Sequence, residues 1–202
     1  MPRRQRMFNA LYQATHPRTR EILSHLKACR LSLRSALAAL SASDRNRTMQ
    51  PDGWWAAELL EHLILVEGPL ERFLTQTWLP HVKAGALGPE TEISTILGAD
   101  SRWSKPECLG VAFEPRGQID LIHGWRELEV IGERLQNTLF TADGRAWSDA
   151  LLGFPSLDKR MSVCDWAIWI GRHEEWHAAD TWRHARERDN LSTPSRSHGG
   201  VP

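Results

Sequence analysis

The chain of 202 residues has little cysteine and no excess charge. Its cysteines, Cys29, Cys108 and Cys164, are odd in number and include no Cys-x-x-Cys pair, which excludes a disulfide framework and a cysteine-based zinc site. Lysine plus arginine and aspartate plus glutamate both number 25, so the formal net charge is zero. Because the sequence has no basic excess with which to gather phosphates, we expect no nucleic-acid partner.

Long hydrophobic runs are missing as well. No apolar run reaches the roughly 18 residues that a membrane span needs, and the basic N-terminal residues lead into no apolar signal-peptide core. We therefore expect no membrane partner and a cytoplasmic location. The length suits a single domain, on the usual range of about 100–200 residues for each.

The sequence does contain segments of helical period. Apolar residues recur three or four apart in the ranges 19–40, 54–79, 118–140 and 163–188, which predicts an all-α fold of four helices. In the second range, Gly68-Pro69 predicts a kink or a restart just after Glu67, because proline lacks a backbone donor. Ser162 and Asp165 form a pattern that resembles a capping box, which predicts the start of the fourth helix.

The spacing of the helices predicts their order in space. A long segment, 80–117, separates the second helix from the third, and such a crossover lets the third start from the same end as the second. The expected fold is an up-down-down-up four-helix bundle in residues 1–189, with an up-down-up-down bundle as the alternative. Residues 190–202 are rich in Ser, Thr, Pro and Gly, and we expect a disordered tail.

Three of the nine histidines lie on the apolar stripes. His62 lies between Leu59 and Val66 at spacings of three and four, and His173 and His177 share one helical face. An isolated core histidine is more often a hydrogen-bonded core residue than a ligand. Three buried imidazoles without a shared partner, however, would leave polar atoms unsatisfied.

These histidines predict a metal site. Two imidazoles four residues apart can reach one ion, and a third can come from a helix packed about 8–10 Å away. Three neutral nitrogen ligands leave positions open for water or substrate, as in catalytic sites. We expect one divalent ion, and the sequence does not distinguish Zn, Ni, Fe or Mn.

Two other metal classes fit less well. His173-Glu174-x-x-His177 also spells the zincin protease signature, but the extended pattern requires Gly at Asp180 and His at Arg183, and no strand series is present. A ferritin-like di-metal site requires Glu-x-x-His twice, whereas the residue three before His62 is a leucine. One metal is therefore favoured over two.

Other polar residues are assigned by their place on the helices. Glu58 lies one turn before His62 on the same face, so it is either a partner that orients that imidazole, a weak fourth ligand, or a solvated carboxylate. Glu174 is assigned a structural salt bridge. His184 is expected to face the dipole at the C-terminal end of its helix, and His25 and His123 are expected on the surface.

Tryptophans and cysteines complete the assignments. We expect Trp55, Trp125 and Trp166 in the core, whereas one or two of Trp169, Trp176 and Trp182 would wall the metal pocket or a dimer interface. Cys29 and Cys164 are expected to be buried, and Cys108 is the thiol to test for reactivity.

The segment Trp54-Trp55-Ala56-Ala57-Glu58-Leu59-Leu60-Glu61-His62-Leu63, followed by Val66-Glu67, and the segment from Trp166 to His177 resemble the DinB-like superfamily of metal-binding four-helix bundles. The resemblance covers about residues 15–188 and includes Phe113-Glu114-Pro115-Arg116-Gly117 and Gly153-Phe154-Pro155-Ser156-Leu157. It implies an up-down-down-up bundle that binds one divalent metal through His62, His173 and His177, commonly as a homodimer. Asp180 departs from the family, because relatives often have an amide there.

Members of the DinB-like superfamily with known chemistry include transferases and isomerases that use mycothiol, bacillithiol or glutathione, which implies a small-molecule thiol as substrate. A metal at this site can depress the pKa of a bound thiol and present a thiolate to an electrophile, or it can ionise a water. The expected function is that of a metal-dependent enzyme, a low-molecular-weight-thiol S-transferase. The alternatives are a metal-dependent hydrolase and a non-catalytic, stress-related metal-binding bundle.

Overall fold

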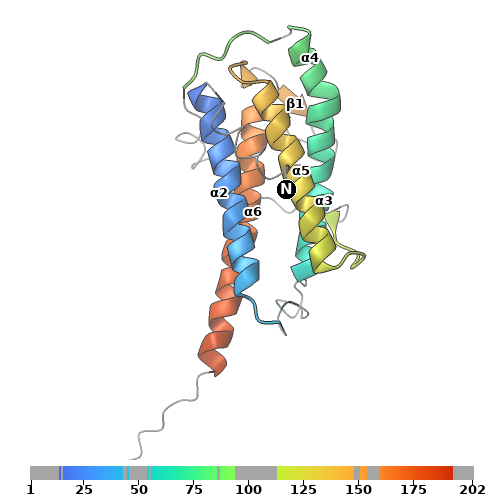
Figure 1. Cartoon of the computed structure of the whole chain (residues 1–202), viewed down its shortest axis with the longest axis vertical. Coiled ribbons are helices and arrows are strands. Elements are labelled where there is room, and N and C mark those ends of the chain that lie inside the picture. Colours follow the sequence, from blue (N-terminus) through green and yellow to red (C-terminus); the bar gives the residue numbers. More distant parts are fainter. Residues whose placement is uncertain are drawn as a thin grey trace, which may run out of the picture.

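The computed structural model describes residues 14, 16–42, 45, 54, 56–85, 87–93, 113–147, 151–153 and 160–192. This part of the chain is mostly helical, which confirms the all-α class (Figure 1). The long helices are α2 (Pro17–Ala39), α3 (Ala56–Phe73), α5 (Leu121–Thr141) and α6 (Val163–Ser192). The π-helical segment η2 (Leu74–Trp78) and the short helix α4 (Leu79–Lys83) continue α3, and β1 (Leu151–Gly153) pairs with β2 (Arg160–Ser162) in an antiparallel ribbon.

The helix starts follow from local chemistry. The Asp120 carboxylate accepts from the His123 backbone N–H at 2.8 Å and caps α5. At α6, the Ser162 hydroxyl accepts from the Asp165 N–H at 3.1 Å, while the Asp165 carboxylate accepts from the Ser162 N–H at 3.3 Å. The predicted capping box is therefore confirmed. None of the described helices combines the length and the apolar character that a membrane crossing requires.

Two boundaries differ from the prediction. Of the kink or restart expected after Glu67, the restart is wrong, because α3 continues through Gly68 and Pro69 and the irregular turn begins only at Leu74. Gly68 has no Cβ to clash with the following proline ring, so the backbone stays helical. Residues 190–192 belong to α6 rather than to a disordered tail, since extending an existing helix costs little; the rest of the predicted tail lies outside the described residues.

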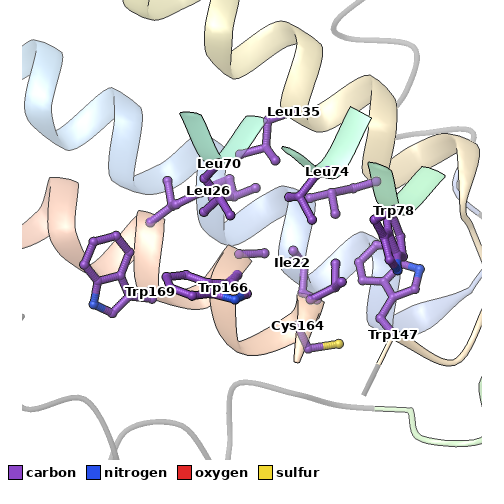
Figure 2. Close-up of a cluster of buried hydrophobic side chains, with 14 of the residues drawn as sticks. Ile22, Leu26, Leu70, Leu74, Trp78, Leu135, Trp147, Cys164, Trp166 and Trp169 are labelled. Carbon is purple, nitrogen blue, oxygen red and sulfur yellow. The ribbon is translucent and has the colours of Figure 1, made fainter. Parts of the chain in front are cut away.

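The helices pack in two pairs. α2 lies along α6 and α3 lies along α5, whereas the contact between the pairs is sparser (Figure 1). The apolar side chains form two separate clusters. One cluster contains Ile22, Leu26, Leu70, Leu74 and Trp166, among others, and Figure 2 shows part of it.

The second cluster lies nearer the C-terminal ends of α2 and α6 and nearer the N-terminal ends of α3 and α5. It contains Leu33 and Leu37 of α2, Leu59 and Leu63 of α3, and Ala178 of α6. Of the buried polar residues, His173, Glu174 and His177 lie between the two sets on α6, and His62 and Glu67 lie on either side of the change from one set to the other on α3. These residues form a polar layer where the two hydrophobic clusters meet, and this layer carries the candidate site.

Candidate metal centre

The structure brings together the three histidines that the sequence singles out. His62 comes from α3, and His173 and His177 come from successive turns of α6. All three are buried, and one ring nitrogen of each lies within 4.8 Å of the others. In the described part of the chain, a search of the histidines, cysteines and carboxylates for groups that could hold a metal ion finds these three histidines.

The nitrogen separations fit a single ion. Nε2 of His173 lies 3.2 Å from Nε2 of His62 and 3.1 Å from Nε2 of His177. Two nitrogens that each lie about 2.0–2.1 Å from one ion, at angles of about 90–110°, are about 2.8–3.4 Å apart. Both separations fall in this range and the third pair of nitrogens lies within 4.8 Å, so the three imidazoles are placed to share one divalent metal.

A backbone carbonyl orients His62. Its Nδ1 lies 2.8 Å from the carbonyl oxygen of Phe113, in the segment that precedes α5. A carbonyl only accepts, so Nδ1 donates the proton and Nε2 of the neutral ring keeps its lone pair for a ligand role. The same segment is tied to α3 by the Gln118 N–H, which donates to the Glu61 carboxylate at 3.1 Å.

His173 has a different environment. Its ring stacks on the indole of Trp169, with centroids 5.0 Å apart and planes 13° apart. Its Nδ1 is buried and has no hydrogen-bond partner among the described residues. The position of this imidazole is therefore set by stacking and by its neighbours on α6.

Each histidine has its own tryptophan. The ring centroids are 4.4 Å apart for Trp54 and His62 and 4.6 Å apart for Trp176 and His177. Trp169 and Trp176, two of the three tryptophans predicted at the edge of the stripe, thus contact the cluster, whereas Trp182 packs against the second hydrophobic cluster. Sequence reasoning missed Trp54, which lies before the start of α3 at Ala56, so that no helical spacing relates it to His62.

Burial keeps the imidazoles neutral. It lowers the pKa of His62, although the Phe113 carbonyl acts in the opposite direction. Burial, and then the neighbouring imidazoles, lower the pKa of His173 well below its usual value and that of His177 to about 3. A neutral imidazole offers a lone pair, and this is the form of histidine that binds a metal.

Glu58 lies beside the segment that covers His62. It is half-buried, and a Cβ on Gly117 would lie 3.7 Å from its Oε1. The hydrogen bond at His62 Nδ1 goes to Phe113 instead, a backbone contact that carries no side-chain signature in the sequence. A role for Glu58 toward the metal stays a prediction.

Glu174 forms a salt bridge, as the sequence analysis assigns. Its carboxylate accepts two hydrogen bonds from Arg30 of α2, at 2.9 Å from Nε and 2.6 Å from Nη2. The Nη2 group also donates to Glu67 of α3 at 2.8 Å, and Nη1 donates to the Leu128 carbonyl of α5 at 2.7 Å. We call Arg30, Glu67 and Glu174 the arginine network.

The arginine network holds more negative than positive groups. The Glu67 side chain is fully buried and that of Glu174 nearly so, while Arg30 supplies one positive charge. Burial, and then the Glu174 carboxylate, raise the pKa of Glu67 well above its usual value, although Arg30 acts in the opposite direction. A cavity of about 390 Å³ between α2, α5 and α6 borders Arg30 and Glu174 on one side.

Two other histidines differ from expectation. His25 is not a free surface residue: it is half-buried, and its Nε2 donates to the Ile168 carbonyl at 3.2 Å. Gly171 makes room for the ring, because a Cβ there would lie 2.3 Å from that nitrogen. His184 is not at the helix end, because α6 continues to Ser192, and its ring lies 3.7 Å from the Asp180 carboxylate. His123 is exposed, as predicted.

The remaining assignments are mostly confirmed. Trp166, Cys29 and Cys164 are buried, and burial raises the pKa of both thiols to about 12. Trp125 is only half-buried, because its indole N–H donates to the Glu129 carboxylate at the cavity rim, 2.9 Å away. Asp180 forms an ion pair with Arg183. Trp55 and Cys108 lie outside the described residues.

Comparison with known proteins finds no matching family model, no matching curated protein and no matching solved structure. The function of this chain is therefore inferred from its residues and their geometry.

Proposed function

We propose that this protein binds one divalent metal ion through His62, His173 and His177. The observation that carries the proposal is the convergence of three buried ring nitrogens within 4.8 Å of one another. The orientation of His62 by the Phe113 carbonyl supports it, because a second hydrogen bond that fixes the ring is typical of metal-ligating histidines.

We further propose that the chain is an up-down-down-up bundle of the DinB-like type. The pairing of α2 with α6 and of α3 with α5 supports this topology. So does the course of the chain in Figure 1, where the colours of α3 and α5 advance toward the same end of the molecule. The homodimer stays a prediction from the resemblance, and the cytoplasmic location stays a prediction from the sequence.

The proposed activity is that of a metal-dependent enzyme with a low-molecular-weight thiol as substrate. A metal held by three neutral imidazoles keeps positions open and supplies Lewis acidity, which lowers the pKa of a coordinated thiol or water. The three tryptophans beside the histidines limit access of bulk water to this site. Hydrolysis and non-catalytic metal binding are the alternatives that the test below separates.

Metal analysis tests the centre. We expect one equivalent of metal in purified wild-type protein and in the control variant His123→Ala, which changes an exposed histidine. We expect His62→Ala and His177→Ala to lose the metal, since each removes a ligand from a different helix. Full metal content in His62→Ala would contradict a site shared by α3 and α6.

Turnover tests separate the enzymes from the binder. Metal-loaded and metal-free protein would be incubated with a panel of thiols and electrophiles, and thiol consumption measured. We expect consumption only with the loaded protein. Metal binding without thiol consumption would favour the alternatives, and ester or amide hydrolysis by the loaded protein would identify a hydrolase.

A further inference from the structure

The two helices that carry the histidines belong to different packing pairs. α6 lies along α2, and α3 lies along α5, so His62 is held by one pair and His173 and His177 by the other. Apolar packing sets the angle between two helices with a scatter of about 15–20°. A directional contact between the two pairs would fix more closely the Nε2 atoms of His62 and His177, which lie 3.2 and 3.1 Å from that of His173.

Arg30 makes such a contact. From α2 it donates to a carboxylate on α3, a carboxylate on α6 and a backbone carbonyl on α5, at distances of 2.6–2.9 Å. One planar guanidinium thus bonds to all three other long helices. Its fork binds Glu174 through two parallel N–H bonds, a geometry that fixes direction as well as distance.

The carboxylates of the arginine network lie next to the histidines in the sequence. Glu174 directly follows His173 on α6. Glu67 follows His62 by five residues on α3, a rise of about 7.5 Å along the helix. A change in the position of either carboxylate is therefore passed to a histidine over a short length of rigid helix.

Gly132 of α5 provides the room that Arg30 needs. A Cβ at this position would lie 3.2 Å from Nη1 and 3.4 Å from Nη2 of Arg30, which is closer than ordinary van der Waals contact. The absence of a side chain there lets the guanidinium reach the Leu128 carbonyl.

We infer that Arg30 is a positioning residue of the metal centre: its hydrogen bonds to Glu67 and Glu174 hold α3 and α6 at the distance and rotation at which His62 meets His173 and His177. This inference rests on the proposed function. Loss of groups that support metal ligands typically lowers metal affinity about 10–100-fold, and we expect a loss of that size when the fork is removed.

The test uses Co²⁺ as the probe, because its affinity is measured by titration and its absorption spectrum reports the coordination geometry. Arg30→Lys keeps the charge but lacks the planar fork. We expect it to bind Co²⁺ about 10–100-fold more weakly than wild type, with an altered spectrum and an unchanged helical circular-dichroism signal. The matched control is Arg34→Lys, which changes a more exposed arginine one turn further along α2.

Two further variants keep the test decisive if Arg30→Lys unfolds. The triple variant Arg30→Met, Glu67→Met, Glu174→Met leaves no unpaired buried charge and should fold. Gly132→Ala removes no charge and displaces Arg30 by a few tenths of an ångström, while the substitution itself favours the helix. We expect the triple variant to show the same 10–100-fold loss of Co²⁺ affinity, and Gly132→Ala a smaller loss of Co²⁺ affinity.

The outcomes separate this inference from the proposed function. If folded Arg30→Lys and the triple variant bind Co²⁺ with wild-type affinity and spectrum, Arg30 does not position the centre, although the centre itself stands. If the wild-type protein binds no Co²⁺, the proposed metal centre is wrong and the role of Arg30 falls with it. Weakened affinity in the Arg30 variants but not in Arg34→Lys supports the inference.

Discussion

The polar layer of this protein contains two buried clusters that differ in one respect. In the arginine network opposite charges meet: the guanidinium donates to two carboxylates and a carbonyl, all within 2.9 Å, although Oε1 of Glu67 is buried without a hydrogen-bond partner among the described residues. In the histidine cluster like atoms meet, because Nε2 of His173 faces the Nε2 atoms of both His62 and His177. This difference leads us to propose a ligand for the histidine cluster and a role in the fold for the arginine network.

The number of protons makes this difference clear. A neutral imidazole carries one N–H, and that of His62 is used at the Phe113 carbonyl. His173 can donate from Nε2 to one of its two neighbours, so a lone pair is left facing a nitrogen. A cation between the three nitrogens would satisfy all of them at once, whereas the arginine network already contains the cation that its two carboxylates bind.

The largest effect is expected when the arginine network is broken. Arg30→Met leaves Glu67 and Glu174 buried without their positive partner, and removal of one member of a buried ion pair costs about 3–5 kcal/mol. Urea unfolding would measure the loss of unfolding free energy. The triple methionine variant is the control and should regain most of the lost unfolding free energy. An unfolding free energy of Arg30→Met equal to that of the wild type would show that the arginine network does not stabilise the fold.

Metal should produce the next largest effect, and only through the histidine cluster. Zinc at about 100 times its dissociation constant should raise the unfolding free energy by about 2.7 kcal/mol, because it binds the folded state. Thermal unfolding with zinc and with a chelator measures this shift. The shift should vanish in His177→Ala and persist in Arg34→Met; an equal shift in His177→Ala would indicate binding elsewhere.

Replacing a histidine in metal-free protein should have a small effect. His173→Leu removes a buried ring whose Nδ1 has no partner in the described part of the chain, so the transfer of an unpaired polar atom into the core is avoided. We expect the unfolding free energy of the metal-free protein to rise or to change by less than about 1 kcal/mol. Chemical unfolding in chelator would measure it, and a loss of several kcal/mol would mean that the histidine cluster is itself structural.

The smallest effect is expected at Arg34. Its ion pair with Glu129 is 3.5 Å long, and about half of each side chain is exposed. Exposed pairs of this kind contribute little, so Arg34→Met should lower the unfolding free energy by less than about 0.5 kcal/mol. If Arg34→Met lost as much unfolding free energy as Arg30→Met in the same urea experiment, the buried arginine network would not differ in stability from an exposed ion pair.

The spacing that predicts that His62 faces the core also occurs at two residues of the arginine network. Arg30 lies four residues after Leu26 and three before Leu33, and Glu67 lies four after Leu63 and three before Leu70. Polar residues flanked in this way face the core. The spacing therefore indicates Arg30 as a core-facing residue and hence as a partner for the salt bridge predicted at Glu174.

Some features had no such signal. The Phe113 carbonyl that orients His62 is a backbone atom, which every residue has, so its contact cannot be read from residue types. The cavity beside Arg30 depends on the spacing of α2 and α5. His25 became an interhelical contact because Gly171 of another helix leaves space for it.

The sequence by itself determined the helices and the pairing of His173 with His177, because positions four residues apart on one helix always share a face. It also determined that His62 faces the core. The tertiary structure alone decided that α3 and α6 pack so that the ring nitrogens of the three histidines converge. It also decided that Arg30, from α2, bonds to both of these helices. Distances within a helix follow from its regular geometry, whereas distances between helices depend on the packing of side chains that are far apart in the chain.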